Sequence, residues 1–143
     1  MSTSIAIVAS GTLIKLASDS SATLFTTIPE SIKIGCPNVK FDLLDVTSHD
    51  SSGWFKQFIP GLSDGENVTD EINFVPTNAI HIQLRTDAYA RTLDSFEILF
   101  PGGGTGANIA FNAYIMSYPA TADVGQVLRA TMTAKVTGEP TWT

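Results

Sequence analysis

The stretch DVTSHDSSGWFKQFIPGLSDGENVTDEINF, from Asp45 to Phe74, decides how this chain is organised. It opens with a β-branched run, and Pro60-Gly61 predicts a sharp turn before a second strand. Its centre carries four large apolar residues close together: Trp54, Phe55, Phe58 and Ile59. The roughly twenty residues from Asp45 to Asn67 have little regular periodicity, and loops of that length in compact domains usually have a function or are disordered. Because disordered segments are poor in aromatic residues, we predict a functional loop.

Strands are predicted on both sides of this loop. Before it, residues 39–43 alternate, with Val39, Phe41 and Leu43 on one face, which predicts a half-buried strand. After it, a second strand places three apolar residues on one face: Val68, Ile72 and Phe74. Asp70 lies on the same apolar side, and such an inward acid usually marks a sheet edge or an interface.

The N-terminal part of the chain predicts short strands. Two β-branched runs, residues 12–17 and 22–28, are separated by the polar residues 18–21, which is a hairpin signal. Residues 31–34 predict another brief strand before Gly and Pro interrupt the chain.

One helix is predicted, from Ala79 to Arg91. Asn78 is a candidate N-cap, and the apolar residues Ile80, Leu84 and Ala88 recur with helical spacing. We expect Asp87 and Arg91 to pair on the outer side of the helix, since they are four residues apart.

The C-terminal third returns to strands. Residues 96–100 lead into a glycine-rich turn at 101–106 and then into a strand over residues 109–118 with strict alternation. Residues 127–136 alternate in the same way and predict its partner. One-sided antiparallel strands with a single helix predict a mainly β fold, an antiparallel β-sandwich or open barrel with one flanking helix, in a single domain spanning residues 1–143.

The charge of the chain is concentrated in one segment. The 143 residues contain 14 acidic and 8 basic residues, and residues 41–74 alone account for the net charge of −6, because Lys56 is their only base. Such a surface repels nucleic acid, whose binding depends on Lys and Arg. The simplest interpretation is a solvated acidic face that maintains solubility. No signal peptide or membrane span is recognisable, so we expect a protein made in a cytoplasm.

Residue patterns of catalytic or metal sites are missing from the sequence. His49, His81 and the single Cys36 have no zinc-site spacing. Ser48, His49 and Asp50 are adjacent, whereas catalytic triads are assembled from distant segments. The glycines at 102–106 lack the Lys and Ser or Thr of a phosphate-binding loop. We therefore expect no catalytic residues, no metal site and no cofactor.

Three short motifs occur in a recognisable order. Asp45-Val46-Thr47 ends a strand, the run from Phe58 to Asp64 (FIPGLSD) forms a turn, and Ile72-Asn73-Phe74 ends a second strand. A helix after Pro76, a strand ending at Phe100-Pro101 and a last strand over residues 127–140 follow. In this order and spacing the chain resembles the tail tube proteins of long-tailed bacteriophages with lambda-like tails, over about residues 11–140.

This resemblance implies a structural role in a virion. Family members form hexameric rings that stack into a hollow tube through which DNA passes without specific binding. The resemblance implies assembly in the host bacterial cytoplasm, with a tail-tip initiator, a tape measure protein and a tail terminator as partners. It also implies no enzymatic activity and a single tube domain without a C-terminal immunoglobulin-like extension.

The resemblance also assigns candidate residues. The long loop would reach the neighbouring ring through five contact residues: Trp54, Phe55, Phe58, Ile59 and Pro60. Aromatic residues dominate interface hot spots, although some of these side chains have the alternative of folding back onto their own domain. Asp70 and Glu71 are candidate lumen acids, because carboxylates along a bore repel phosphates and let DNA slide.

Three other interpretations remain open at the level of sequence. The chain has features of a tube protein of a type VI secretion or contractile system, which shares the fold. A carbohydrate-binding β-sandwich would need an exposed platform, which Tyr114, Met116 and Tyr118 are placed to supply. An enzyme built on a sandwich is the third, and the missing catalytic set argues against it.

Overall fold

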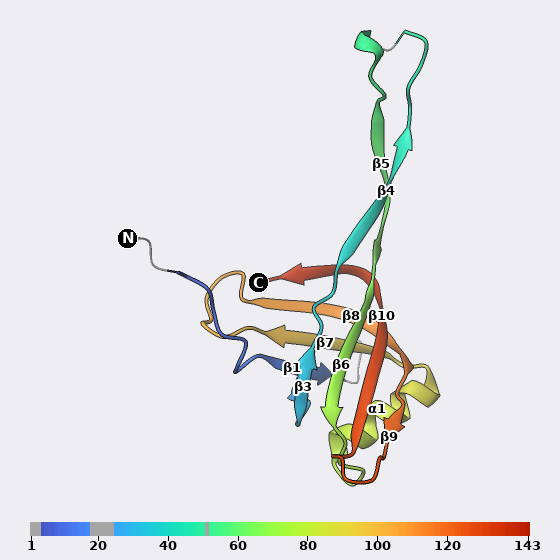
Figure 1. Ribbon diagram of the computed structural model, residues 1–143. Helices are drawn as coiled ribbons and strands as arrows, with labels where there is room; N and C mark the ends of the chain where they lie inside the picture. The colour runs from blue at the N-terminus through green and yellow to red at the C-terminus, as the bar shows by residue number, and fades with distance from the viewer. Residues whose placement is uncertain (1–3, 18–24, 51) are drawn as a thin grey trace.

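The computed structural model describes residues 4–17, 25–50 and 52–143, and it has two parts. One part is a curled, eight-stranded antiparallel sheet with a helix packed on it, and the other is a two-stranded hairpin that projects away from this body (Figure 1). We call the hairpin the arm (residues 39–65) and the remainder the body. The arm is the feature that positions the candidate site.

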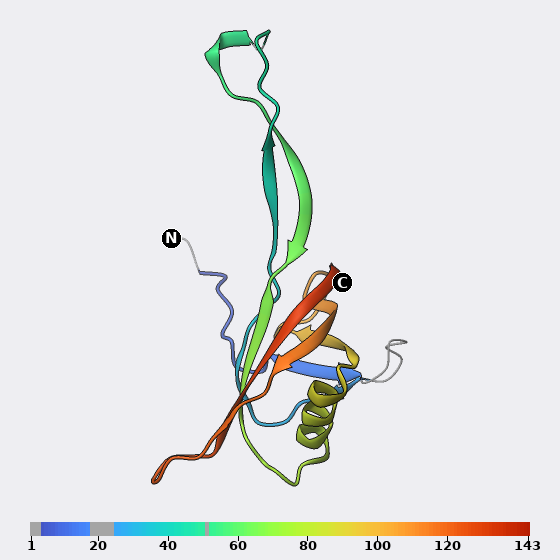
Figure 2. The same cartoon turned by 90° about the vertical axis from the view of Figure 1, so that its right-hand side faces the viewer.

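The strands of the body form one continuous sheet in the order β2-β1-β7-β8-β10-β6-β3, with β9 paired to β10. Its strands are β1 (Leu13–Ala17), β2 (Thr26–Thr27), β3 (Ser31–Ile34), β6 (Asn67–Asn73), β7 (Leu93–Leu99), β8 (Asn108–Ser117), β9 (Ala120–Thr121) and β10 (Arg129–Trp142). The arm consists of β4 (Val39–Asp45) and β5 (Phe58–Gly65), and its tip contains a short 3-10 turn, Ser52–Trp54. Of the two predicted architectures, the open barrel is therefore the one observed, because one sheet curls over its own core (Figure 2).

Alternation builds the core as the sequence predicts. Along β8, Ile109, Phe111, Ala113 and Ile115 are buried, and along β10 the buried residues are Ala130, Met132, Ala134 and Val136. Phe96 from β7 stacks on Phe111, with ring centroids 5.5 Å apart. The predicted N-terminal hairpin is confirmed where it is described, since Lys15 of β1 pairs with Thr27 of β2. Its turn, residues 18–21, lies outside the described residues.

The single helix, α1 (Ala79–Ala90), is confirmed with its predicted cap. The Asn78 side-chain oxygen accepts hydrogen bonds from the backbone N–H of Ile80 at 2.9 Å and of His81 at 3.3 Å, which satisfies two free donors of the first turn. Leu84 is fully buried, and Ile80 and Ala88 pack against the core. Among the described residues, no helix is long and apolar enough to cross a membrane.

The predicted surface pair of Asp87 and Arg91 does not form. Asp87 is buried and accepts a hydrogen bond from Gln83 Nε2 at 2.8 Å, whereas Arg91 caps the helix in a left-handed conformation and is exposed. Asp87 instead lies beside Asp94 of β7, and burial together with the Asp87 carboxyl raises the pKa of Asp94 to about 8. The helix contacts the sheet along more of its surface than the spacing of Ile80, Leu84 and Ala88 indicates.

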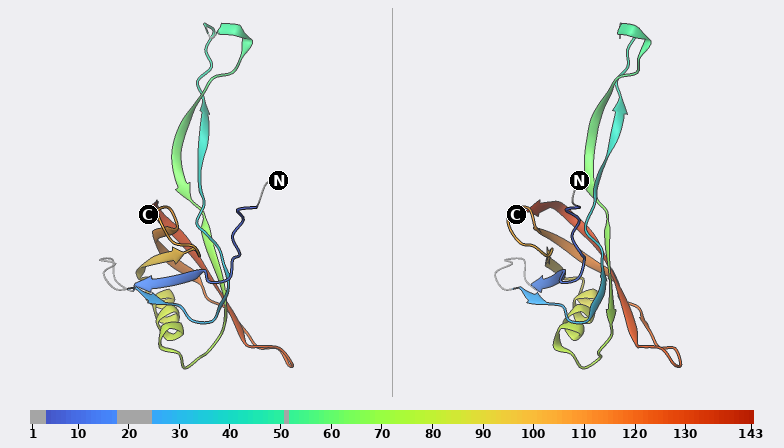
Figure 3. Two further views of the ribbon diagram at one scale, coloured as in Figure 1. Left: turned by 90° about the vertical axis from the view of Figure 1, so that its left-hand side faces the viewer. Right: turned by 60° about the vertical axis from the view of Figure 1, so that its left-hand side comes forward.

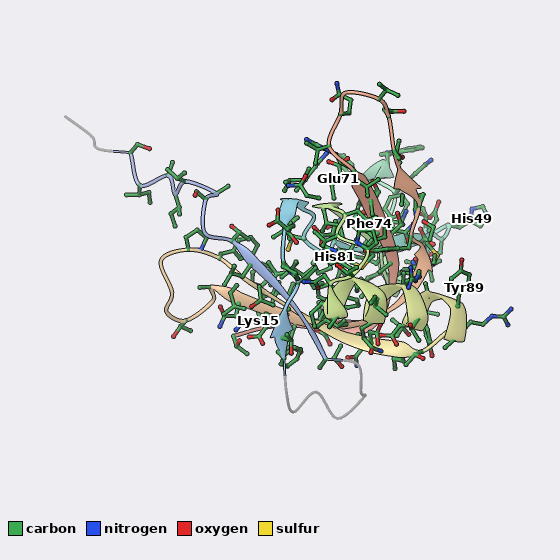
Figure 4. The ribbon with its side chains drawn as sticks, turned by 90° about the horizontal axis from the view of Figure 1, so that it is seen from below. Lys15, His49, Glu71, Phe74, His81 and Tyr89 are labelled. Carbon is green, nitrogen blue, oxygen red and sulfur yellow. The ribbon has the colours of Figure 1, made fainter. Side chains whose placement is uncertain are left out.

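His81 has a structural role. Its Nδ1 accepts a hydrogen bond from the N–H of Val75 at 3.1 Å, and its Nε2 lies 3.0 Å from the carbonyl oxygen of Pro29, which places the proton on Nε2. The ring also stacks on Phe74 (Figure 4). Both ring nitrogens are therefore used to join α1 to the segments before β3 and after β6.

Three predictions for the central segment are wrong. Residues 58–65 form β5 and not part of an irregular loop, and Pro60-Gly61 lies inside this strand and not at a turn. Phe41 pairs with Ser63 and Leu43 with Pro60, so one extra residue bulges out of β5 opposite Asp42. Proline is tolerated there because a hairpin has free outer edges. The predicted half-buried strand, β4, is exposed at every position of the isolated subunit.

Candidate assembly surfaces

The arm is a long ribbon held together mainly by its own backbone. Pairing runs from Val39 opposite Gly65 at the root to Asp45 opposite Phe58, and the N–H of Val46 continues it by donating to the carbonyl oxygen of Gln57 at 2.9 Å. Eight residues of extended strand span roughly 26 Å, so the tip lies well beyond the body. Figures 1 to 3 show the arm leaving the body at the end opposite α1.

Large apolar side chains cover this ribbon without a core beneath them. The exposed ones on the arm are Val39, Phe41, Leu43, Leu44, Val46, Trp54, Phe55, Phe58, Ile59 and Leu62. A two-stranded hairpin is at best marginally stable by itself in water, and contiguous exposed apolar patches of this kind mark interaction sites. The arm is therefore a surface built to be covered by another molecule.

The bulge divides the arm into two zones. Near the root, one face carries Val39 and Phe41, while the other carries charged side chains such as Lys40 and Asp64, which lie directly opposite each other. Beyond the bulge both faces carry large apolar side chains, because the pair Leu43–Pro60 occupies one face and Leu44–Ile59 the other, and Asp45 opposite Phe58 adds a charge at the end of the ribbon. An outer zone that is apolar on both faces fits between two partner surfaces.

Ion pairs and one close approach fix the root of the arm. Lys135 of β10 donates to Asp64 Oδ2 at 2.9 Å and also to the carbonyl oxygen of Gly65, and Lys40 lies 3.3 Å from Glu66. A Cβ at Gly65 would lie only 2.9 Å from Val136 Cγ1, so only glycine lets β5 lie directly on β10 at this point. The root is thereby held against the body and sets the direction of the arm.

The tip presents its aromatic residues to solvent. Trp54 is 104% exposed and Phe55 is 78% exposed. Gly53 and Trp54 both have positive φ angles, 76° and 65°, and such a conformation is unusual for a bulky residue. Backbone strain of this kind concentrates at binding sites.

Local hydrogen bonds keep two acids near the tip ionised. The backbone N–H of Thr47 donates to Asp45 Oδ1 at 2.9 Å, and the Ser48 hydroxyl donates to Asp50 Oδ1 at 2.6 Å. The side chain of Thr47, followed by its backbone N–H, lowers the pKa of Asp45, and the Ser48 hydroxyl lowers the pKa of Asp50. The apolar tip therefore carries fixed negative charge.

All five predicted contact residues lie on the arm and are exposed, and none folds back onto its own body. Trp54 and Phe55 form the tip, while Phe58, Ile59 and Pro60 belong to β5, where Phe58 and Ile59 point to opposite faces. Their role in contacts between rings stays a prediction. The sequence reasoning did not include Phe41, Leu43, Leu44 and Leu62 in this surface. Pairing residues 39–46 with residues 58–65 as two strands of one hairpin would have placed these four residues on the same surface.

The two candidate lumen acids differ in position. Asp70 has no exposed surface, its Oδ2 accepts a hydrogen bond from the Ser31 hydroxyl at 3.3 Å, and burial raises its pKa to about 7. A fully buried carboxyl does not present charge to a bore. The prediction that Asp70 lines the lumen is therefore wrong, because its side chain lies in the core. Glu71 points to the opposite, partly exposed face and stays a candidate.

Charges on the outer face of the sheet are balanced. Glu71 lies directly opposite Lys33, and Glu97 directly opposite Lys15. The rest of this face on β6 and β10 carries Thr69, Thr131 and Thr133 in the middle, with Arg129 and Lys135 at the two ends of the paired stretch. The arm therefore carries −2 of the net charge of −6, through four acids and two bases, and the remaining −4 belongs to the body.

The predicted carbohydrate platform is not assembled. Tyr114 and Met116 are exposed on β8, but Tyr118 follows the end of the strand, packs against the core and makes an edge contact with Phe74. Two of the three side chains remain on the surface, which is too few for the predicted platform.

Comparison with known proteins decides between the remaining interpretations. Residues 8–143 match the family model described as lambda phage tail tube protein. The chain belongs to the lambda phage tail tube protein family. Its structural role in a tail tube, indicated by the motifs in the sequence, is thereby confirmed. No curated protein is similar enough in sequence to count as a match.

Solved structures of tails share the fold of this tail tube subunit. A chain from the virion of a native gene transfer agent particle superposes with a TM-score of 0.76 and 17% identity, covering 96% of this chain and 99% of that one. A chain from the gene transfer agent tail refined with C6 symmetry gives 0.74 and 16%, covering 92% and 94%. The SPP1 tail tube gives 0.72 and 14%, covering 92% and 77%. The curled sheet, the single helix and the overall topology are thus those of tail tubes.

Proposed function

We propose that six copies of this subunit form a ring, and that rings stack through their arms into the tube that conducts DNA out of the virion. The observation that carries this proposal is the arm, whose outer zone is apolar on both faces and has no partner surface within the described subunit. The fold is shared with a tail that has C6 symmetry, which supports the number six.

Symmetry explains why one subunit needs two kinds of contact. A ring requires a heterologous interface that closes after a fixed rotation, while a stack requires an axial interface that never closes. The sheet ends in the edge strands β2 and β3, whose outer backbone groups are free to pair with a neighbour in the ring. The arm, directed away from the body, supplies the axial contact.

The outer face of the sheet is the proposed wall of the bore. Its other face is filled by the core and α1, so only the face with Glu71 and the threonines is free to line a channel. Neutral hydroxyl groups and the paired charges of Glu71 and Lys33 hold phosphates weakly, because phosphate binding requires a surplus of Lys and Arg. DNA then slides along this wall without specific binding.

The subunit acts as a building block and not as an enzyme in this proposal. Its further partners are a tail-tip initiator, a tape measure protein inside the bore and a tail terminator, and assembly takes place in the host cytoplasm. The family model describes a lambda phage tail tube protein, which favours a phage tail over a contractile system.

Electron microscopy of the purified protein tests the proposal. We expect hollow tubes, or rings that stack as the concentration rises, and helical reconstruction should give six subunits per turn of the ring. Tail-tip initiator complexes are added in a parallel sample, since nucleation of a ring is slow when six subunits must meet.

The control is a variant lacking the outer arm, in which residues 44–59 are replaced by a two-residue Asn-Gly turn that closes the hairpin near its root. It should keep the unfolding temperature of the body and lose stacking. Wild-type protein that stays monomeric at high concentration even with initiator complexes present contradicts the proposed function.

A further inference from the structure

The subunit has opposite charges at its two ends. Asp45 and Asp50 lie near the arm tip, whereas α1 and the start of β10 lie at the end from which the arm points away (Figure 3). Because stacked rings are related head to tail, the tip of one copy faces the α1 end of the next. The distribution of charge along this axis therefore bears on what the arm binds.

At the arm end, three acids have no ion pair among the described residues. Asp42, Asp45 and Asp50 are exposed, and Lys56 is the one base of the outer zone. The two ion pairs of the described chain, Lys40 with Glu66 and Lys135 with Asp64, both lie at the arm root. The tip thus combines exposed aromatic side chains with a net negative charge.

At the other end, three arginines are exposed. Arg85 lies on α1, Arg91 is the C-cap residue that follows it, and Arg129 begins β10. They take part in neither of the two ion pairs of the described chain. Acids are fewer here: Asp123 lies in the turn before β10, and Glu30 accepts a hydrogen bond from Asn73, the neighbour of Arg129.

The same end also offers exposed apolar surface beside the arginines. Tyr89 is 85% exposed and Ile82 is 38% exposed, both on α1. Seen from this end, α1 lies unobstructed, with Tyr89 near its C-terminal end and pointing away from the body (Figure 4). Arginine and tyrosine are both favoured at interface hot spots, and guanidinium groups stack on aromatic rings such as that of Trp54.

We propose that the outer surface of α1, together with Arg91 at its C-terminal cap, is the receptor for the arm tip of a second copy in the neighbouring ring. This inference rests on the proposed function and specifies the partner surface of the arm. Asp45 and Asp50 face Arg85 and Arg91 across the junction, and the tip aromatics pack against Tyr89 and Ile82. Complementary charge fixes which end of a ring is accepted, because like ends repel.

Charge-swapped variants test the junction. Variant A carries Asp45→Lys and Asp50→Lys, and variant B carries Arg85→Glu and Arg91→Glu. Each variant places like charges across every junction, and we expect the critical concentration for tube growth to rise at least about tenfold. The junctions between A and B are complementary in both orders. A 1:1 mixture should therefore form tubes in which the two variants alternate.

The variant AB carries all four substitutions in one chain and is the internal control. Its junctions pair a basic arm with an acidic helix, so tube growth should return to within about threefold of the wild type. Glu139→Lys, at an exposed acid of β10 outside both surfaces, should assemble like the wild type. Unfolding temperatures of all variants establish that the body is intact.

The outcomes separate this inference from the function on which it rests. Wild-type protein that never forms tubes refutes the proposed function and this inference with it. Wild-type tubes together with normal growth of A and B leave the function standing and refute the receptor. If neither AB nor the 1:1 mixture forms tubes while the unfolding temperatures are unchanged, the receptor is also refuted, because restoring complementary charge then does not restore the junction.

Discussion

The arm and the body of this subunit are made from the same kinds of residue and use them in opposite ways. In the body, Phe96 and Phe111 stack with no more than 4% of their surface exposed, whereas in the arm Trp54 and Phe55 are almost entirely in water. Alternation in β8 and β10 separates an apolar face from a polar one, but beyond the bulge the arm is apolar on both faces.

This difference shows at which step each region gains free energy from burial, either folding or assembly. Burial of apolar surface stabilises the body when a single chain folds. The arm gains its burial only when another molecule covers it, so its residues contribute to assembly and little to the stability of the monomer. We therefore predict that substitutions in the body lower the stability of the monomer, whereas substitutions in the arm weaken assembly.

The largest effect is expected in the body. Phe96→Ala removes a fully buried ring from its stack on Phe111 and should lower the free energy of unfolding by about 3–5 kcal/mol. Urea unfolding followed by circular dichroism measures this loss. A loss below about 1 kcal/mol would mean that this site is not the packed core described here.

The next effect is expected at the tip. Trp54→Ala and Phe55→Ala should leave the unfolding free energy within about 0.5 kcal/mol of the wild type, because neither ring packs on the body. Assembly should weaken by about 2 kcal/mol or more for each, as expected of interface hot spots. Sedimentation of tubes against protein concentration gives the critical concentration.

Ile5→Ala is the matched control, since Ile5 is 94% exposed in the segment before β1. It should change neither quantity. If the tip variants lower monomer stability as much as Phe96→Ala does, the contrast between arm and body is wrong.

A smaller effect is expected where the two regions meet. Gly65→Ala places a Cβ 2.9 Å from Val136 Cγ1, and relief of this clash should cost about 1–3 kcal/mol of stability and tilt the arm. We expect both the unfolding temperature and tube growth to fall. Ser63→Ala, two residues away on an exposed position, is the control and should alter neither.

The last effect depends on pH. Burial raises the pKa of Asp70 to about 7 from the ordinary value of 3.8, so between these values the folded chain holds a proton that the unfolded chain has lost. Unfolding then releases a proton, and stability falls as the pH rises through this window. Asp70→Asn keeps an acceptor for the Ser31 hydroxyl and removes the titration.

Asp70→Asn should match the wild type near pH 4 and gain on it by up to about 1.4 kcal/mol for each pH unit between pH 4 and pH 7, the range over which the folded carboxyl stays protonated. Thermal unfolding across this range is the measurement. Asp50→Asn, at an exposed acid whose pKa is lowered, should not show this gain at high pH. An unchanged pH profile in Asp70→Asn would show that this carboxyl is ionised in the folded subunit.

The sequence alone determined the elements whose signals are local. Alternation defined β8 and most of β10, and the Asn78 cap with its following apolar residues defined α1. Short motifs in a fixed order indicated the tail tube family. These signals are readable because burial on one side of a strand or helix imposes a period on the residues themselves.

Only the tertiary structure decided the features that depend on distant partners. The strand β5 was missed because Pro60-Gly61 has the composition of a turn, and the bulge that accommodates it exists only when β5 pairs with β4. Asp87 was assigned to the surface because helical spacing does not reveal that β7 brings Asp94 against it. The exposure of the arm also depends on tertiary structure, because contacts with β10 hold its root so that the ribbon points away from the body. A pattern of apolar residues indicates that a face is covered, but it does not indicate whether the same chain or another molecule covers it.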